Sequence, residues 1–344
     1  MRNNKIEVVH FQRKSREGSN FSLEFIFKDV RQRLDDKVKF KVIVAKHESN
    51  GILKRILNTF YASGFQEEVN HITGDIHYIN LLFNKKRTIL TILDCGIMNS
   101  ESLLKRIIFK WFWLKIPIWK SRYITTISEA SKLDIIKYTG CDPDKIKVIP
   151  VAVSEIYKPS PKEFNDVKPV LLQIGTAYNK NLERLIEAIS TIQCRLVIIG
   201  KLDEPKLNLL KHYSISYENK INLTVEEVYH EYEKCDIVTF VSTYEGFGMP
   251  IIEGNWVERP VIAGNNSSMI QVANDAALLI DAMDVTDIRR GIQSIITDQQ
   301  LREDLIAKGR INRVRFSGEQ IAEMYYDLYK EVYIANRGIY SNEN

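Results

Sequence analysis

The residues with the clearest chemical potential lie in the segment Ser242–Glu253, STYEGFGMPIIE, where two glutamates flank a glycine-containing turn. An apolar run ends just before this segment at Val241, and Pro250 suits the first turn of a helix. The pattern therefore predicts a strand, a loop and a helix in succession. Glu245 would lie in the loop, and Glu253 would lie about one helical turn beyond the proline.

This turn has the features of a ligand-binding loop. Gly246 and Gly248 allow a ligand to approach the backbone closely, and the free N–H groups of a helix start suit a phosphate. The carboxylates of Glu245 and Glu253 can accept hydrogen bonds from the hydroxyls of a neutral polyol. Two glutamates at this spacing alone are more typical of a solvated loop. The glycines, the proline and the preceding strand instead favour a site at the carboxyl end of a parallel strand.

The elements that must position this loop alternate along the chain. Helices are predicted at Phe21–Leu34, Asn181–Ile192 and Val225–Lys234. Apolar, β-branched runs predict strands at Ile6–Phe11, Val38–Ala45, Arg87–Asp94, Tyr123–Ile127, Val170–Gly175, Arg195–Gly200, Asp236–Val241, Pro260–Ala263 and Ala277–Ile280. Because strands that alternate with helices form parallel sheets covered on both faces, the two tandem series predict two doubly wound domains.

The boundary between the predicted domains is marked by Lys158–Pro161, where two prolines and a serine indicate a linker. The first domain would cover residues 1–158 and the second residues 159–316. Glu319–Val332 predicts a long terminal helix with an apolar stripe, within a segment of residues 317–335.

Composition and charge place limits on the class of protein. The chain has 344 residues, of which 44% are hydrophobic and 27% charged, as in an ordinary globular protein with two domains. Residues 1–150 carry 27 Lys and Arg against 16 Asp and Glu, whereas residues 151–344 carry 21 against 28. The basic first half predicts contact with something anionic, such as membrane phosphates, a phosphorylated acceptor or nucleic acid.

Several other functions are disfavoured by what the sequence lacks. It contains no G-x-x-x-x-G-K-[ST] motif, no zinc-ligand spacing and no Asp-x-Asp motif. The basic half matches no recognisable nucleic-acid-binding module, so we expect no nucleic-acid partner. The four cysteines are widely spaced, and neither a signal peptide nor a long apolar run is evident, so we expect reduced thiols and a cytoplasmic protein.

The segment around the two glutamates resembles the signature of glycosyltransferase family 4, a retaining family with the GT-B fold. In that family a Tyr-Glu-Gly-Phe-Gly-Leu-Pro run is followed by a second Glu eight residues after the first. Further segments resemble the same family: Ala263–Met269, Asp275–Asp281, Leu172–Asn181, Thr126–Glu129, Val148–Pro150 and His71–Tyr78. The resemblance implies an α/β GT-B protein, with two Rossmann-like domains facing across a cleft and the terminal helix packed back on the first domain.

The resemblance also implies roles for individual residues. Glu253 would bind the ribose hydroxyls of a nucleotide, Glu245 would bind the hydroxyls of the donor sugar, and Lys180 would neutralise the departing diphosphate. Further donor contacts would come from the glycine-containing turn and from a first-domain loop: Phe247, Gly248, Met249, Gly18 and Ser19. Thr176 and Ala177 stand where many members carry an arginine, which leaves Lys201 as a candidate for a second phosphate cation.

The first-domain residue near the reacting carbon is left open, because this chain has Leu93-Asp94 where many members have His-Asp. His77 and Asp94 are the leading candidates, followed by Asp75 and His71. Each of them taken alone is more typical of a structural hydrogen-bonding residue than of a catalytic one.

The function implied by the resemblance is transfer of a sugar from a UDP- or GDP-linked donor to a hydroxyl of a glycan or lipid-linked acceptor in bacterial surface polysaccharide synthesis. A hexosyltransferase that needs no metal is expected. Another GT-B enzyme, such as a sugar-nucleotide epimerase, and a catalytically inactive binding partner are the alternatives. The stretch Lys105–Arg122 mixes bases with aromatic residues, so it is either an ordinary packed helix or a peripheral contact with the inner face of an anionic membrane.

Overall fold

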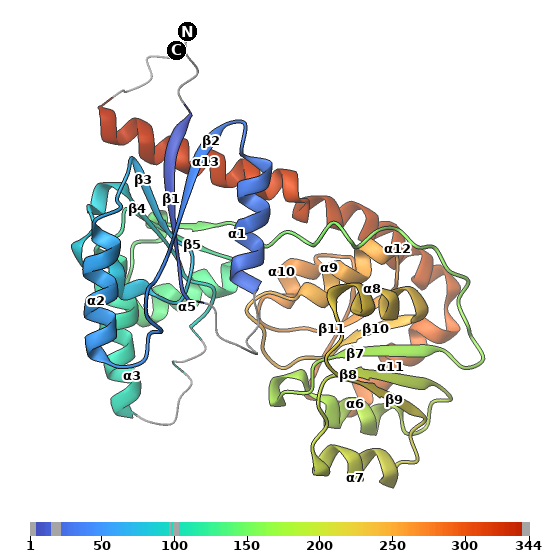
Figure 1. Ribbon diagram of the computed structural model, residues 1–344. Coiled ribbons are helices and arrows are strands. Elements are labelled where there is room, and N and C mark those ends of the chain that lie inside the picture. The colour runs from blue at the N-terminus through green and yellow to red at the C-terminus, as the bar shows by residue number, and fades with distance from the viewer. Residues whose placement is uncertain (1–4, 15–21, 96–97, 99–102, 339–344) are drawn as a thin grey trace. The chain divides into compact units, whose positions relative to one another are not determined.

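The computed structural model describes residues 5–14, 22–95, 98 and 103–338 and divides into two compact units (Figure 1). Unit 1 comprises residues 1–152 together with 318–344, and unit 2 comprises residues 153–317. The division falls between Ala152 and Val153, slightly before the predicted linker at Lys158. The reason is that the N–H of Val153 already donates to the carbonyl of Phe316, which lies in unit 2.

Unit 1 contains a six-stranded sheet in the order β2-β1-β3-β4-β5-β6, and all neighbouring strands run parallel. Its strands are Ile6–Gln12 (β1), Val38–Val44 (β2), Val69–Ile72 (β3), Thr88–Thr91 (β4), Tyr123–Thr126 (β5) and Ile146–Val148 (β6). Its helices include Ser22–Arg33 (α1), Ile52–Ser63 (α2), Leu103–Phe109 (α3), Ile116–Trp119 (α4), Glu129–Thr139 (α5) and Gly318–Arg337 (α13).

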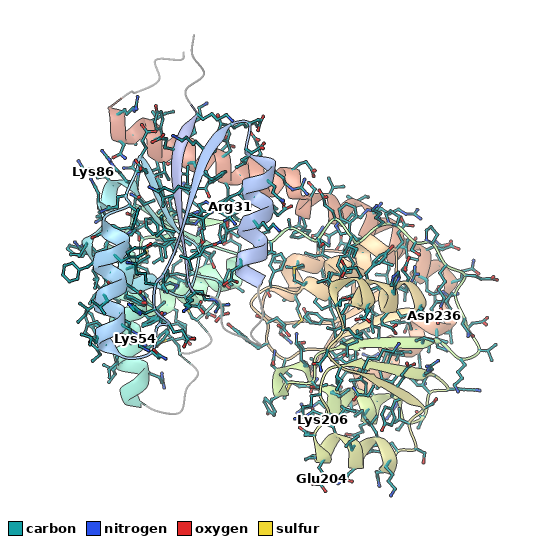
Figure 2. All side chains as sticks on the ribbon, viewed as in Figure 1. Arg31, Lys54, Lys86, Glu204, Lys206 and Asp236 are labelled. Carbon is teal, nitrogen blue, oxygen red and sulfur yellow. The ribbon has the colours of Figure 1, made fainter. Side chains whose placement is uncertain are left out.

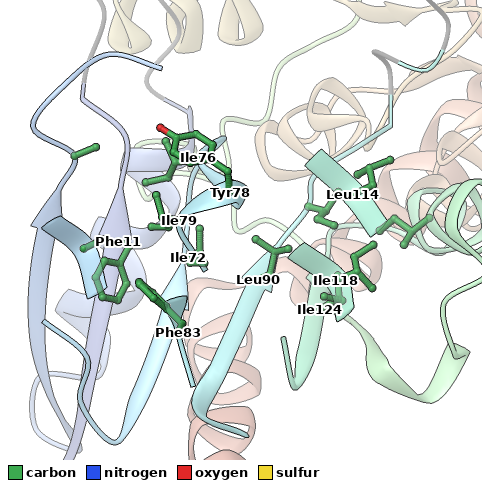
Figure 3. Packing of buried hydrophobic residues seen from close by; sticks show 14 of the residues in the cluster. Phe11, Ile72, Ile76, Tyr78, Ile79, Phe83, Leu90, Leu114, Ile118 and Ile124 are labelled. Atoms are coloured by element: carbon green, nitrogen blue, oxygen red, sulfur yellow. The ribbon is translucent and has the colours of Figure 1, made fainter. Parts of the chain in front are cut away.

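One apolar cluster of unit 1 lies between the sheet and the helices that follow its strands (Figure 3). Phe11 of β1, Ile72 of β3 and Leu90 of β4 are almost completely buried there. They meet Leu114 and Ile118 from the segment before β5. Burial of these side chains holds the strand ends in place, and the loops that carry polar residues leave the sheet from those ends.

Unit 2 contains a second parallel six-stranded sheet, in the order β12-β11-β10-β7-β8-β9. Its strands are Val170–Ile174 (β7), Arg195–Ile199 (β8), Tyr217–Lys220 (β9), Ile237–Phe240 (β10), Val261–Gly264 (β11) and Leu278–Ile280 (β12). Its helices are Leu182–Ile189 (α6), Glu204–His212 (α7), Val225–Lys234 (α8), Met249–Val257 (α9), Met269–Ala273 (α10), Val285–Thr297 (α11) and Gln299–Asn312 (α12).

Each strand predicted from an apolar run is confirmed, with small differences at the ends. Strands β3, β6 and β9 were not predicted. In β3 the polar residues Asn70 and His71 interrupt the apolar pattern although both side chains are fully buried. Strand β9 has the polar sequence YENK and lies at the edge of its sheet, where one side of the strand has no neighbour.

Helix α13 belongs to unit 1 through a buried polar chain. Arg31 donates to Nδ1 of His10 at 3.2 Å, so the His10 proton lies on Nε2, which is 2.9 Å from the Tyr329 hydroxyl. That hydroxyl can then donate to Nδ1 of His71 at 2.9 Å, and Nε2 of His71 lies 2.8 Å from Thr91 Oγ1. Burial lowers the pKa of His71 to about 3. Burial, His71 and Arg31 lower the pKa of His10 well below its usual value, so both imidazoles are neutral in this arrangement.

The segment Lys105–Arg122 is not one regular helix. Helix α3 passes into a π-helix at Lys110–Lys115, which continues into the short helix α4. Leu114, Pro117 and Ile118 are buried, whereas Trp111 and Phe112 are exposed. Part of the segment therefore packs as an ordinary core element, and part of its apolar surface faces solvent.

Candidate active site

The polar residues of unit 2 that were expected to bind a donor gather where the strand order of the sheet changes direction. From β7 the chain runs outward through β8 and β9, and it then returns to place β10 on the other side of β7. The loops after β7 and β10 consequently leave the sheet as neighbours. Open parallel sheets bind ligands at such a point, beyond the carboxyl ends of the strands. Lys180 follows β7, and Glu245 follows β10.

Lys180 and Glu245 form an ion pair in this position. Nζ of Lys180 donates to Oε1 of Glu245 at 2.7 Å, and the two side chains are 21% and 16% exposed. Asn179 donates to the same carboxylate oxygen at 3.1 Å and to the carbonyl of Tyr244 at 3.0 Å. The loops after the two strands are therefore joined, and a cation and a carboxylate are presented together at a partly accessible surface.

Gly175, which follows β7, makes room for the lysine. Its φ of 88° lies in the region that favours glycine. A Cβ at this position would lie 3.0 Å from Cε and 3.1 Å from Cγ of Lys180. The ammonium group also lies 4.9 Å from the centroid of the Phe240 ring. The Lys180 side chain thus crosses the backbone of Gly175 to reach Glu245.

The loop after β11 holds the glycine-containing turn by hydrogen bonds. Ser268 Oγ donates to the carbonyls of Glu245, at 2.9 Å, and Phe247, and Ser267 Oγ also donates to the carbonyl of Glu245 at 2.6 Å. Gly248, at φ 131°, precedes the first residue of α9. These hydrogen bonds constrain the turn, and the N–H of Met249, the first residue of α9, lies next to it. Pro250 has no N–H, and the N–H of Ile251 donates to the carbonyl of Gly248 at 3.0 Å.

Glu253, in α9, is surrounded by tyrosine hydroxyls. Tyr232 of α8 donates to Oε2 of Glu253 at 2.5 Å, and Tyr157 also hydrogen-bonds its carboxylate. Burial raises the pKa of Glu253, while the two tyrosines and the nearby charge of Lys180 act to lower it. Lys180 therefore influences both glutamates. The tyrosines were not identified from the sequence, because they lie far from Glu253 along the chain.

Unit 1 contains a pocket of about 420 Å³ within its own residues. His77 and Asp75 line it from the loop after β3, and Asp94 lines it from the loop after β4. Arg55 of α2 and Trp113 of the π-helix line it as well, and they were not identified from the sequence. The structure thus brings together three of the four first-domain candidates.

The aromatic wall of this pocket is ordered by several contacts. Trp113 stacks on Phe109 with ring centroids 5.1 Å apart and an interplanar angle of 24°. The guanidinium of Arg55 lies 4.6 Å from the Trp113 ring, and its Nε donates to the carbonyl of Ser49 at 3.1 Å. This wall offers an apolar face, and the neighbouring carboxylates offer hydrogen-bond acceptors. The two together match the apolar face and the hydroxyl groups of a sugar ring.

The two leading first-domain candidates differ in their surroundings. His77 is buried, and its Nδ1 donates to the carbonyl of Trp113 at 2.8 Å. Burial lowers the pKa of His77, so the ring is neutral. Asp94 is exposed at the pocket. Asp75 is also exposed, and it is paired with Arg13 at 3.0 Å. Both carboxylates are therefore accessible at the pocket, whereas His77 is held by the backbone.

His71 lies apart from this pocket, because both of its ring nitrogens are engaged in the buried chain to Tyr329 and Thr91. Gly18 and Ser19 lie outside the described residues. Lys201 follows β8, and the Thr176 hydroxyl donates to its carbonyl at 2.7 Å, so its exposed side chain leaves the sheet beside the loop after β7. Within the described part of the chain, no three His, Cys, Asp or Glu residues are arranged to hold a metal ion.

Comparison with known proteins gives one family match and several distant relatives. A family model described as "Glycosyl transferases group 1" matches residues 157–312, which lie within unit 2. The serotype-specific mannosyltransferase WbdA of Escherichia coli is 24% identical over 254 residues, covering 66% of this chain and 31% of the relative. The O-antigen chain mannosyltransferase B of Escherichia coli is 28% identical over 233 residues, covering 61% of each. The chain thus spans less than two thirds of the length of these relatives.

Solved structures share the fold along almost the whole chain. A glycosyltransferase from Rickettsia africae superposes with a TM-score of 0.73 at 16% identity, covering 96% of this chain and 99% of that one. Anabaena Alr3699/HepE, in complex with UDP and glucose, superposes with a TM-score of 0.72 at 14% identity, covering 95% and 100%. Together with the two parallel sheets, this likeness shows an α/β fold of the GT-B type.

Proposed function

We propose that this protein is a glycosyltransferase that moves a sugar from a nucleotide-sugar donor to a hydroxyl of a glycan or lipid-linked acceptor in bacterial surface polysaccharide synthesis. The observation that carries the proposal is the Lys180–Glu245 ion pair, at the point where the sheet of unit 2 changes direction. A lysine suits a diphosphate, and a carboxylate suits sugar hydroxyls. The family match to residues 157–312 supports the same chemistry.

The donor is proposed to lie across the loops after β7 and β10. Lys180 would contact the diphosphate, and Glu245 would accept hydrogen bonds from the sugar. Glu253, held by Tyr232 and Tyr157, would accept the ribose hydroxyls. The N–H groups near Phe247, Gly248 and Met249 would hold sugar and phosphate oxygens, as helix starts do for anions.

The acceptor is proposed to enter the pocket of unit 1. An acceptor sugar could place an apolar face on Trp113 while its hydroxyls reach Asp94. The names of the mannosyltransferase relatives make mannose the first sugar to test as donor.

The reaction is proposed to retain the anomeric configuration and to need no metal ion. As the bond between the sugar and the diphosphate breaks, negative charge grows on the leaving phosphate. Lys180 would stabilise that charge without a metal, with Lys201 as a candidate for a second cation. A diphosphate oxygen would then assist in removing the acceptor proton, so that no protein nucleophile is required.

The proposal is tested by incubating the protein with UDP- and GDP-sugars, GDP-mannose and UDP-glucose among them, with and without EDTA. Release of the nucleoside diphosphate, together with a raised unfolding temperature, supports it. Binding without release would indicate an inactive binding partner, and conversion of the nucleotide sugar to an epimer would indicate an epimerase. The anomeric configuration of the product tests retention separately.

A further inference from the structure

Helix α2 of unit 1 has its apolar face turned toward solvent. Ile52, Leu53, Ile56, Leu57 and Phe60 are between 46% and 77% exposed. These positions are spaced i, i+1, i+4, i+5 and i+8, so they form one continuous stripe along the helix. A helix on the surface of a globular protein normally buries such a stripe. The exposed stripe therefore needs an explanation beyond the folding of unit 1.

Three residues of α2 are buried on its inner face: Ala62 packs in the apolar cluster of unit 1, and Asn58 and Thr59 are hydrogen-bonded, which fixes the orientation of the helix. Asn58 is buried, accepts from the N–H of His47 at 3.0 Å and donates to the carbonyl of His47 at 2.8 Å. It also donates to the Tyr78 hydroxyl at 3.2 Å. The hydroxyl of Thr59, likewise buried, donates to the carbonyl of Arg55 at 2.8 Å. Turning the apolar stripe inward would remove Asn58 from the backbone groups of His47 and from the Tyr78 hydroxyl, so the stripe stays outside.

Helix α3 and the π-helix that follows it carry a second set of exposed apolar residues. Arg55 of α2 contacts Trp113 of the π-helix, which joins the two elements. On the same segment, Ile107, Ile108, Trp111 and Phe112 are exposed. The ammonium of Lys115 lies 4.7 Å from the Trp111 ring. Tryptophan and lysine side by side are typical of the boundary between lipid headgroups and acyl chains.

The two segments that carry these apolar residues contain only positive charges. Residues 49–66, which include α2, contain Lys54 and Arg55 and no Asp or Glu. Residues 102–128, which include the π-helix, contain Lys and Arg residues and likewise no Asp or Glu. Lys54, on α2, is exposed (Figure 2). A second copy of the chain would bring the same positive charges against these, which is unfavourable in a symmetric interface.

We propose that the exposed apolar stripe of α2 docks on an anionic lipid bilayer. The apolar side chains would enter the acyl boundary while Lys54 and the bases of the π-helix segment meet the headgroups. Within the part of the chain that the structure describes, no helix is long and apolar enough to cross a bilayer. Attachment would then be peripheral and would depend on both apolar area and lipid charge.

The test is co-sedimentation with vesicles of phosphatidylcholine alone and of phosphatidylcholine mixed with phosphatidylglycerol. The wild-type protein is compared with the double variant Leu53→Ser/Phe60→Ser. The control is Ile311→Ser, which removes an isoleucine of α12 that is 76% exposed in unit 2. Circular dichroism and thermal unfolding show whether each variant folds. Light scattering gives the oligomeric state without vesicles.

The wild type and the control should bind the mixed vesicles, and the double variant should bind at least about tenfold more weakly. Lys54→Glu should weaken binding at low salt, and added salt should weaken binding of the wild type. The proposal is overturned if the wild type does not sediment with mixed vesicles or binds both compositions equally. It is also overturned if the folded double variant binds the mixed vesicles as well as the wild type does. The same holds if light scattering shows a dimer that the double variant abolishes and this dimer does not bind vesicles. The experiment uses no sugar nucleotide, so its result is independent of the proposed transfer reaction.

Discussion

Replacing Lys180 by alanine is expected to slow the proposed reaction rather than weaken donor binding. In the free protein the ammonium group is already positioned, 2.7 Å from Glu245 and across the backbone of Gly175. It is therefore preorganised, and its side chain is only 21% exposed. A preorganised group gains more from charge that develops as the bond breaks than from charge already present in the donor.

The size of the effect follows from what one such group contributes. Removing one preorganised donor typically lowers kcat by about 10²–10³-fold, equivalent to about 2.7–4 kcal/mol. We expect Lys180→Ala to lower kcat by this factor, with a smaller change in KM for the donor. Lys180→Arg should be more active than Lys180→Ala but less active than the wild type, because a planar guanidinium does not fit where the side chain of residue 180 crosses the backbone of Gly175. Gly175→Ala should produce a milder loss, because the added Cβ would displace the lysine.

The assay is steady-state kinetics with varied donor at saturating acceptor, and thermal unfolding shows that each variant is folded. Lys211→Ala is the matched control, because Lys211 is an exposed lysine of α7 in the same unit. A large rise in KM with an unchanged kcat would show that Lys180 only binds the donor. Wild-type kinetics in Lys180→Ala would refute the assignment of the cation altogether.

Four further predictions concern Glu253, Tyr329 and Trp113. Glu253→Ala should weaken binding of a nucleoside diphosphate by roughly 10- to 150-fold, measured by calorimetric titration, and unchanged binding would remove Glu253 from the site. Burial raises the pKa of Glu253, so between its pKa in the unfolded state and its pKa in the folded state only the folded protein holds the proton. The contribution of Glu253 to the free energy of unfolding should therefore fall as pH rises through that range. The free energy of unfolding of Glu253→Gln should depend less on pH. Tyr329→Phe should destabilise unit 1 by about 1–3 kcal/mol in denaturant unfolding, because His10 and His71 each lose a buried partner; an unchanged midpoint would contradict this. Trp113→Ala should raise KM for the acceptor more than KM for the donor, and equal increases would argue against an acceptor pocket in unit 1.

The local pattern of the sequence was sufficient for the fold class and for part of the site. Apolar β-branched runs predicted the strands, because a strand that is buried on both faces of a parallel sheet has a nearly continuous apolar sequence. The turn at Gly246 and Gly248, followed by Pro250, predicted the loop and helix after β10. These features depend on residues close together along the chain. Strand β3 was missed for the same reason, since its buried Asn70 and His71 are stabilised by partners that the local pattern does not show.

The sequence by itself thus determined two parallel α/β units and named Lys180 and Glu245, which follow strands, and Glu253, which lies in a helix. Only the tertiary structure decided which of these meet. The strand order places β7 beside β10, which pairs Lys180 with Glu245. Folding also surrounds Glu253 with two tyrosines, and Asn58 turns the apolar stripe of α2 outward. Such contacts join residues that are distant in sequence. The periodicity of a strand or helix indicates which of its faces is apolar, but it does not indicate which other element that face will contact.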